Sequence, residues 1–376
     1  MVTRFKLLQS KENWPLDGHL PKVWILASRH SGDNTQLMAL ADELGWPCDV
    51  KRLSYRRLEE LLRLTGVPTL AGVDLAKSSA LAPPWPDLVM SAGRSTEAVG
   101  FWIRRHANPG VRLVFVGTPW SDPGRFDLVI TTPQYGLPKA PNILHNALPL
   151  HGVTPEKLAS EAARWEDRLC HLPKPRIAVL VGGSSGPYLF SPDSAERLGR
   201  EASRLASTTG AALLVTTSAR TPVPVADALE KAITVPSWFY RWEKSAADNP
   251  FHAFLGMSEA SIVTGDSISM LSEASAAGKP VYLFDIEEGA QAMRADDGQG
   301  GFPPIDWRGR DLETTAFRLL MRHAPTRWSR DLRIVHRHLV QHGIASWLGE
   351  TPRPATSRTG SGLSSTAARV RQLFGL

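Results

Sequence analysis

The stretch that most constrains the fold of this chain is residues 260–284, which read ASIVTGDSISMLSEASAAGKPVYLF. Residues 261–263 are apolar and β-prone, and the polar residues that follow predict a tight turn. Apolar residues then recur at helical spacing, at Leu271, Ala274 and Ala277. Gly278 is placed to end the helix in the left-handed conformation, and Pro280 prevents the helix from continuing. The stretch therefore predicts strand, turn, helix, turn and strand, which is one βαβ unit.

The same unit predicts a nucleotide site. Its helix would point free backbone N–H groups and a positive dipole end at the carboxyl edge of a parallel sheet. The small side chains of Ser267 and Ser269, with Asp266 and Met270 beside them, leave room for a phosphate. Glu273 lies one turn beyond Ser269, roughly 6 Å along the helix axis, which suits a carboxylate bound to a ribose diol. The alternative is an ordinary crossover helix with a solvated Glu273.

Two better-known phosphate motifs do not fit this stretch. A P-loop that ended at Lys279 would need Gly at position 273 and Ser or Thr at position 280, where the chain has Glu273 and Pro280. The GxGxxG spacing of dinucleotide-binding turns is also missing from this turn. The pattern therefore indicates a nucleotide site of another kind.

The run TGDSISMLSEASAAGKPVY, residues 264–282, resembles the signature of bacterial relatives of the plant mitochondrial fission family named for elongated mitochondria. More distantly, it is similar to the donor-binding turn of GT-B glycosyltransferases, such as the N-acetylglucosaminyltransferase of peptidoglycan synthesis. The resemblance implies an α/β protein with two Rossmann-like, doubly wound domains that face each other across a cleft. It implies a nucleotide-sugar donor in the C-terminal domain. Function inferred through the second likeness is analogy.

The composition agrees with two domains and argues against a membrane-spanning helix, a signal peptide and a zinc site. The chain has 376 residues, 42% apolar and 21% charged, which is typical of a soluble globular protein longer than one ordinary core. No run of 18 apolar residues occurs, and the start has no apolar signal region, so we expect neither a spanning helix nor a signal peptide. Cys48 and Cys170 are the only cysteines, which favours a reducing compartment and no zinc site.

These features predict a cytoplasmic protein. The net charge is +6 without a dense basic block, and the chain contains 12 Trp. A basic surface with exposed Trp side chains would suit peripheral contact with the cytoplasmic face of a membrane, although Trp is more often a core residue. We expect no nucleic acid partner.

Alternating strands and helices up to residue 130 predict a first doubly wound parallel sheet. The expected strands are 23–27, 49–53, 87–90, 111–116 and 126–130, and the expected helices are 35–44, 55–64 and 97–106. Residues 131–175 are rich in Pro and are interrupted by one expected helix at 155–169, so they predict the passage between domains. We place the boundary near Leu172.

A second αβ series follows this passage. Its expected strands are 176–181, 212–216, 261–263 and 281–284, and its expected helices are 193–208, 268–277, 312–321 and 330–348. Three parts result: an N-terminal acceptor domain at 1–172, a C-terminal donor domain at 173–348, and a Gly/Pro/Ser-rich link with a short terminal helix at 349–376. We expect the terminal helix to return to the first domain.

Two further features of the second domain indicate phosphate binding. Gly183, Ser184 and Ser185 belong to a Gly-rich turn after a strand, whose amides can form an anion-binding concavity. This turn is similar to the GGS-x-G turn of the peptidoglycan enzyme. Arg220 follows the next strand and could bind a diphosphate with two hydrogen bonds. The alternatives are an ordinary turn and a solvated surface Arg.

Two other loops complete the expected donor site. The acidic loop 285–288, with Gln291, follows the last strand, where GT-B enzymes contact the donor sugar. The resemblance implies no metal and no cofactor there, and the alternative is a solvated acidic loop. The segment 249–251 corresponds to a loop that meets the nucleobase in such enzymes, with Tyr240 or Trp242 as stacking candidates.

The turn SRHSGDNTQ, residues 28–36, resembles the N-terminal motif of the family and corresponds to the acceptor-side loop of inverting GT-B enzymes. An acceptor hydroxyl needs a carboxylate or an imidazole within hydrogen-bond reach, and Asp33 and His30 are the candidates. Asp33 could equally cap the helix that follows.

Three functions fit these patterns, because no Ser-His-Asp, HExxH, CxxC or kinase signature occurs. The first is a glycosyltransferase that moves a sugar from a nucleotide-sugar to a lipid or polysaccharide acceptor of a bacterial cell envelope. The second is a non-catalytic membrane-surface adaptor, because the plant relatives recruit a dynamin-like GTPase to the mitochondrial surface. The third is a nucleotide-sugar epimerase, which can share the fold but should carry several acid/base groups around the sugar.

Overall fold

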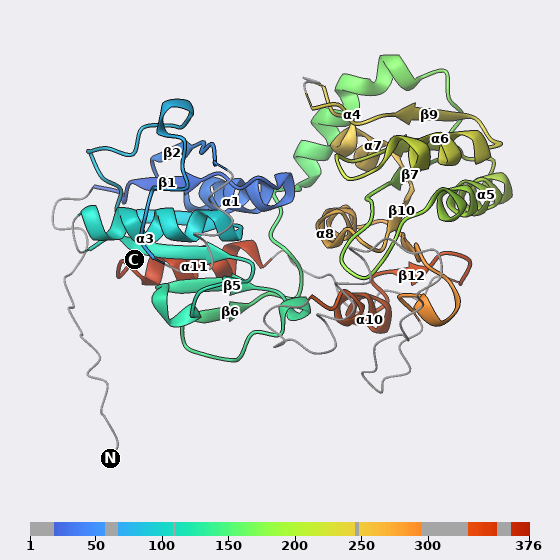
Figure 1. Ribbon diagram of the computed structural model, residues 1–376. Helices are drawn as coiled ribbons and strands as arrows, with labels where there is room; N and C mark the ends of the chain where they lie inside the picture. The colour runs from blue at the N-terminus through green and yellow to red at the C-terminus, as the bar shows by residue number, and fades with distance from the viewer. Residues whose placement is uncertain (1–18, 57–66, 108–109, 245–247, 295–329, 352–361) are drawn as a thin grey trace. The chain divides into compact units, whose positions relative to one another are not determined.

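The computed structural model describes residues 19–56, 67–107, 110–244, 248–294, 330–351 and 362–376 (Figure 1). Contacts divide the chain into two compact units. Unit 1 comprises Met1–Ile130 and Leu363–Leu376, and unit 2 comprises Thr131–Gly362. The described residues form two six-stranded sheets with helices packed on them, so the predicted α/β class with two Rossmann-like sheets is confirmed.

The first sheet has the strand order β2-β1-β3-β4-β5-β6. The strands are β1 (Val23–Leu26), β2 (Cys48–Lys51), β3 (Leu88–Ala92), β4 (Arg112–Val116), β5 (Leu128–Thr131) and β6 (Ile143–His145). Strands β1 to β5 pair in parallel, and β1, β3 and β5 are buried along their whole length. Their nearly continuous apolar runs are what a sheet buried on both faces requires.

Helices α1 (Ser31–Leu44) and α3 (Glu97–His106) accompany this sheet, with the 3₁₀ turns η2 (Leu75–Lys77), η3 (Arg94–Thr96), η4 (Pro123–Arg125) and η5 (Pro133–Tyr135). The terminal helix α11 (Leu363–Gln372) belongs to unit 1 and packs on α1. The rings of Trp46 and Phe374 meet edge to face at 5.3 Å, and Arg371 donates to the carbonyl oxygen of Glu43 at 2.7 Å. The predicted return of a short terminal helix to the first domain is confirmed.

The second sheet has the strand order β12-β11-β10-β7-β8-β9, and every neighbouring pair is parallel. The strands are β7 (Arg176–Leu180), β8 (Ala212–Thr216), β9 (Ser237–Tyr240), β10 (Ala260–Thr264), β11 (Val281–Phe284) and β12 (Ser346–Trp347). From β7 the chain proceeds to one edge, and from β10 to the other. The chain therefore runs from the neighbouring strands β7 and β10 toward opposite edges of the sheet, and the carboxyl ends of two such strands are where these sheets bind ligands.

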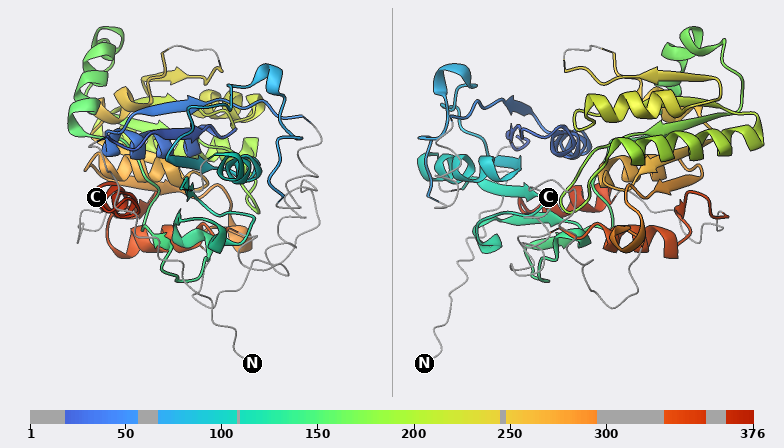
Figure 2. Two further views of the ribbon diagram at one scale, coloured as in Figure 1. Left: turned by 90° about the vertical axis from the view of Figure 1, so that its left-hand side faces the viewer. Right: turned by 45° about the vertical axis from the view of Figure 1, so that its right-hand side comes forward.

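The helices of unit 2 are α4 (Pro155–Leu169), α5 (Pro192–Thr209), α6 (Val223–Ala232), α7 (Phe251–Met257), α8 (Ile268–Ala276) and α10 (Arg333–Gln341), with the 3₁₀ turn η6 (Gly289–Gln291). Helices α5 and α6 lie side by side (Figure 2). The predicted βαβ unit is present as β10-α8-β11, and Gly278 adopts the expected left-handed conformation with φ +70°. Within the described residues, no helix is long and apolar enough to cross a membrane.

Helix α4 packs within unit 2, whereas the sequence analysis places the domain boundary after it, near Leu172. Its buried residues Trp165 and Leu169 join the core of the second sheet, and the Trp165 ring meets Phe254 of α7 at 6.2 Å. Arg164 and Arg168 also pair with Asp248, at 3.0 and 2.6 Å. The apolar face of α4 thus packs on the second sheet, and by contacts unit 2 already begins at Thr131.

One predicted element is wrong in part. The sequence predicts a continuous helix at 330–348, but α10 ends at Gln341 and β12 follows as a short parallel strand beside β11. Gly343, with φ +66°, lies between the two elements. The helix expected at 312–321 and residues 57–64 of the helix expected at 55–64 lie outside the described part of the chain, whereas Tyr55 is described and forms an isolated bridge with Val73 instead of a helical turn.

Helix α10 is attached to the loop after β10 by a buried histidine. Nε2 of His336 donates to the carbonyl oxygen of Gly265 at 2.6 Å, and its ring meets Trp347 edge to face at 5.5 Å. Among the described residues, Nδ1 of His336 has no hydrogen-bond partner. Because burial opposes the charged form, the pKa of His336 falls to about 4. His336 therefore stabilises the fold as a neutral ring.

Acid should weaken the fold through this residue. The folded-state pKa of His336 lies below the ordinary value of 6.5, so the unfolded chain takes up a proton first as the pH falls. The contribution of His336 is complete above pH 6.5 and is lost toward pH 4, at a cost of roughly 3 kcal/mol of unfolding free energy. Chemical denaturation at several pH values should show this loss.

The variant His336→Gln can still donate to the carbonyl of Gly265 but cannot titrate. It should unfold with a shallower dependence on pH between 7 and 5 than the parent. Some dependence should remain, because burial also lowers the pKa values of His151 and His338. An unchanged slope in the variant would show that His336 is not the group responsible.

Candidate functional site

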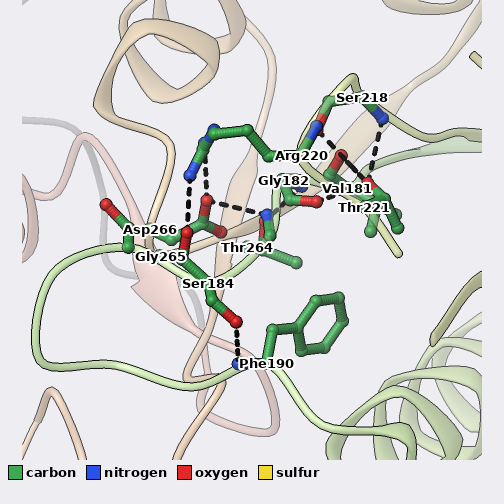
Figure 3. A network of polar contacts seen from close by, with 12 residues as sticks. Val181, Gly182, Ser184, Phe190, Ser218, Arg220, Thr221, Thr264, Gly265 and Asp266 are labelled. Carbon is green, nitrogen blue, oxygen red and sulfur yellow. Dashed lines mark hydrogen bonds and ion pairs between the residues drawn. The ribbon is translucent and has the colours of Figure 1, made fainter. Parts of the chain in front are cut away.

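The candidate site of unit 2 lies where the loops after β7 and β10 meet (Figure 3). The amide of Gly182 donates to Oγ1 of Thr264 at 2.8 Å, and the amide of Gly183 donates to Oδ2 of Asp266 at 3.0 Å. A β-carbon on Gly182 would come within 2.1 Å of Oδ2 of Asp266. One on Gly183 would come equally close to the backbone carbonyl oxygen of Arg220. Both glycines are therefore required by the close approach of these loops.

Asp266 is the buried centre of this arrangement. It is 1% exposed, and its Oδ2 atom also forms an ion pair with Nη2 of Arg220 at 2.7 Å. Its other oxygen, Oδ1, is buried and has no hydrogen-bond partner in the described part of the chain. A carboxylate in this position repels other anions, so its role in the loops is to hold Gly183 and Arg220 rather than to contact a phosphate directly.

Arg220 presents a partly exposed guanidinium group beside Asp266. Nη1 donates to the carbonyl oxygen of Ser184 at 3.3 Å, and the side chain is 41% exposed. A guanidinium carries five N–H groups, so three of those of Arg220 have no partner among the described residues. The turn that carries Arg220 is fixed by Thr221, whose hydroxyl donates to the carbonyl oxygen of Gly182.

The two serines of the Gly-rich turn already have partners in the protein. Oγ of Ser184 accepts from the amide of Phe190 at 3.0 Å, and Oγ of Ser185 accepts from the guanidinium of Arg330 at 2.7 Å. The backbone of Ser185 also bridges to Tyr188. The turn is thus a fixed loop beside Arg220.

The N-terminus of α8 lies directly after Asp266. Ser267 occupies the N-cap position, but its side chain makes no capping hydrogen bond. The Ser191 and Thr154 hydroxyls, by contrast, cap α5 and α4. The amides of the first turn of α8, which includes Ser269 and Met270, have no acceptor within the helix. They are positioned to bind an anion with the help of the helix dipole.

Glu273 lies one turn further along α8 and is held by a histidine. Its Oε2 atom accepts from Nε2 of His252, on α7, at 3.0 Å. Both side chains are partly buried, with 11% of Glu273 and 25% of His252 exposed. His151 lies close enough to Glu273 to interact with its charge. Burial lowers the pKa of His151, and the charge of Glu273 opposes this effect in part. Sequence analysis did not identify His252, which carries no local motif.

The acidic loop after β11 is mostly an internal structural feature. Asp285 is buried, and its carboxylate accepts from the amides of Glu287, Met293 and Arg294 at 3.0–3.1 Å. Burial raises its pKa, although these hydrogen bonds act in the opposite direction. Gln291 is buried in the 3₁₀ turn η6 that follows. The described residues contain no cluster of three or more metal-binding side chains.

The candidates for base contact lie near the end of β9. Tyr240 is half-buried and Trp242 is 37% exposed. The amide of Trp242 donates to Oγ1 of Thr217 at 2.8 Å, which ties this segment to the loop that carries Arg220. Asn249 begins α7 by accepting from the amide of Phe251 at 3.0 Å.

In unit 1, Asp33 and His30 lie in the turn between β1 and α1. Oδ2 of Asp33 accepts from the hydroxyl of Ser28 at 2.8 Å, and the amide of His30 donates to the same hydroxyl oxygen at 3.2 Å. His30 is exposed and occupies the N-cap position, so Asp33 is in the first helical turn and is not the cap itself. The side chains of Asp33 and Ser28 form a carboxylate–hydroxyl pair at the carboxyl end of β1.

A further acidic residue of unit 1 was missed by the sequence analysis. Glu97 is 4% exposed, and its two carboxylate oxygens accept from the amides of Trp120 and Ser121 at 2.6 and 2.9 Å. Burial raises its pKa. Glu97 fixes the loop after β4, at the same edge of the sheet as Asp33, and its buried position at the start of α3 gives no sequence signal.

Comparison with solved structures gives weak global likenesses. A glycosyltransferase from Rickettsia africae ESF-5 aligns with 94% of this chain and 98% of its own, at 10% identity and a TM-score of 0.45. A UDP-GlcNAc 2-epimerase from Methanocaldococcus jannaschii, solved with UDP-GlcNAc and UDP, aligns with 93% of this chain and 99% of its own, at 10% identity and a TM-score of 0.48. Scores below 0.5 do not establish a shared function.

Comparison of sequences is more informative. The Mitochondrial fission protein ELM1 of Arabidopsis thaliana is 30% identical over 224 residues, which are 54% of this chain and 52% of the plant protein. The chain thus spans about half the length of this relative. An uncharacterized protein, RP120, of Rickettsia prowazekii (strain Madrid E) is 24% identical over 296 residues, 70% of this chain and 82% of that protein.

A sequence model of one family, described as Mitochondrial fission ELM1, matches residues 31–300. The match covers most of the chain and includes residues 264–282, whose pattern suggested this family from the sequence, and Gly183, Arg220 and Glu273 of the candidate site. The chain therefore belongs to the Mitochondrial fission ELM1 family.

Proposed function

We propose that unit 2 binds the nucleoside diphosphate part of a nucleotide-sugar and that the protein transfers the sugar to an acceptor. The observation that carries this proposal is the uncapped N-terminus of α8 beside the exposed guanidinium of Arg220. These groups supply N–H donors and positive charge to one region after β7 and β10. A diphosphate would satisfy both, because it is anionic and has several acceptor oxygens.

The internal carboxylate of Asp266 supports this arrangement. A buried Asp266 holds Arg220 in one orientation through the 2.7 Å ion pair, so the side chain does not have to be ordered when a phosphate binds. The unpartnered N–H groups of Arg220 can then meet the ligand. Asp266 itself is shielded from the ligand by its burial.

Glu273 is the proposed ribose contact. A carboxylate accepts two hydrogen bonds from a vicinal diol, and Glu273 is one helical turn from the amides proposed to bind the diphosphate. Among the described residues, the only hydrogen-bond partner of its carboxylate is His252. The sugar would extend toward the loop that contains Gln291, and Trp242 or Tyr240 would contact the base.

For the transfer step we propose Asp33 as the general base, with His30 as the second candidate. An acceptor hydroxyl forms the new glycosidic bond, the bond between sugar and diphosphate breaks, and the nucleoside diphosphate leaves with its electron pair. Asp33 accepts the hydroxyl proton. The amides of α8 and Arg220 stabilise the charge of the departing diphosphate. We propose a cell-envelope lipid or polysaccharide as acceptor, at the cytoplasmic face of the membrane, with no metal or cofactor.

The relative named as a mitochondrial fission protein supports a second candidate, a non-catalytic adaptor on the same fold. An adaptor has no need of an uncapped helix next to a pre-oriented Arg. The epimerase alternative needs several acid/base groups around the sugar, and Asp285 of the acidic loop is already held by three backbone amides. Binding followed by release of product separates the three functions.

The first test of this proposal is the variant Arg220→Lys. Lysine keeps a positive charge beside Asp266 but lacks the planar guanidinium group with its several N–H donors. The affinity for a nucleoside diphosphate should therefore fall about 10-fold to 100-fold. The ligand is chosen by a thermal-shift screen of uridine, guanosine, cytidine and thymidine diphosphates. A ligand at 100 times its Kd should add about 2.7 kcal/mol of stability to the parent. Calorimetry then gives both affinities.

The matched control is Arg200→Lys. Arg200 is exposed on α5 and pairs with Glu196 at 3.4 Å, so the exchange should leave the affinity unchanged. Equal affinities of the Arg220→Lys variant and the parent would remove Arg220 from the site. A parent that binds none of the four diphosphates would overturn the proposed donor.

The second test concerns turnover. Asp33→Asn should keep the affinity for the nucleotide, because the proposed donor groups all belong to unit 2. It should lower turnover about 10²-fold to 10⁴-fold, which is the usual contribution of a general base. The assay is release of nucleoside diphosphate with a membrane-lipid extract as acceptor.

The control for this test is Asp42→Asn, an exposed position on the same helix, which should keep full turnover. If Asp33 serves only to bind the hydroxyl of Ser28, the Asn variant should stay fully active, and His30 becomes the candidate base. A parent protein that binds nucleotide but never releases product would favour the adaptor.

A further inference from the structure

We infer that His252 is a positioning residue that holds Glu273 for the ribose hydroxyls and so makes the site select ribonucleotides over 2′-deoxyribonucleotides. This inference rests on the nucleotide site proposed above. It concerns the orientation of one carboxylate, which no motif of the sequence identifies.

The contact between His252 and Glu273 shows which carboxylate oxygen of Glu273 is already hydrogen-bonded. A carboxylate can only accept, so Nε2 of His252 carries the hydrogen of the 3.0 Å bond to Oε2 of Glu273. Oε1 of Glu273 has no hydrogen-bond partner among the described residues and is therefore the oxygen left for a hydroxyl. Oε2 keeps a second lone pair for another hydroxyl. One histidine thus fixes the carboxylate and leaves capacity for both hydroxyls of a ribose.

Both partners stand on fixed elements. His252 is in the first turn of α7, which leads into β10, and Glu273 is in the second turn of α8, which leaves the same strand. Helix α7 packs on α4, where the ring of its Phe254 meets Trp165 at 6.2 Å. On α8, the hydroxyl of Ser272 donates to the carbonyl oxygen of Pro149 at 2.7 Å. The pair therefore joins two helices that are each held independently of the contact.

The energetic reason for selectivity is pre-organisation. A free Glu side chain loses rotamer freedom when it binds a ligand, and that loss reduces the affinity it can contribute. With His252 in place, the loss has occurred before the nucleotide arrives. The benefit applies only to ligands that contact Glu273, so His252 should affect binding of the ribose hydroxyls and not of the diphosphate.

The experiment measures a ratio of affinities. ADP, GDP, CDP, UDP and their 2′-deoxy counterparts are titrated by calorimetry, with inorganic pyrophosphate as the probe for the phosphate contacts alone. In the parent, the best-bound ribonucleotide should bind about 10-fold or more tightly than its 2′-deoxy form, because a hydrogen bond to a charged group is lost. His252→Ala should bring this ratio close to one and leave pyrophosphate binding unchanged.

Three further variants separate positioning from general damage. His252→Gln places an amide N–H near the position of Nε2 and should restore most of the selectivity. His252→Ala in a Glu273→Gln background should have little further effect on the ratio. Ser275→Ala, on the same helix, removes a hydroxyl that donates to the carbonyl of Leu271 and should keep the parent ratio.

The outcomes distinguish a failure of the proposed nucleotide site from a failure of the role of His252. If no nucleotide binds to the parent, both the proposed function and this inference are overturned. If the parent binds nucleotides without ribose selectivity, or if selectivity survives in His252→Ala, the inference alone is overturned. A parallel loss of nucleotide and pyrophosphate affinity in His252→Ala would show a structural role and would also contradict it.

Discussion

The buried carboxylate of Asp266 is the contact on which the loops of unit 2 depend. A charge with 1% exposure is costly unless it is paired and hydrogen-bonded, and here one oxygen meets both the Gly183 amide and Arg220. This contact joins loops that follow three different strands, β7, β8 and β10. It explains why glycine is needed at positions 182 and 183, since a β-carbon on Gly182 would occupy the place of the carboxylate.

The topology of the second sheet determines where this contact can form. Strands β7 and β10 are neighbours although more than 80 residues separate their ends, so their loops meet even though the chain then runs to opposite edges of the sheet. Helix α8 begins directly after this loop, and α10 holds the loop through the hydrogen bond between His336 and the carbonyl oxygen of Gly265. His336 thus holds the loop at Gly265, and the next residue, Asp266, binds Gly183 and Arg220.

Sequence patterns were sufficient for the elements of this site but not for its contacts. The β10-α8-β11 unit follows from local signals, namely the apolar spacing of Leu271 and Ala274 and the stop at Gly278. Asp266 and Gly183 are 83 residues apart, and no local pattern encodes that they bond. The partner of Glu273 was missed for the same reason, since His252 is a single polar residue at the start of a short apolar helix. The sequence does not distinguish strand β12 from the helix before it, because its two residues, Ser346 and Trp347, are too few for an alternating pattern.

The packing of α11 on α1 has a consequence for synthesis. Unit 1 is assembled from the two ends of its sequence, with about 230 residues of unit 2 between them. At roughly 5–20 residues per second, a ribosome needs on the order of 10–50 s to make the intervening segment. During that time Trp46 lacks the ring of Phe374, and the nascent first sheet has its α1 helix uncovered on one side. A helix that is translated after unit 2 therefore completes a unit whose sheet is translated before it.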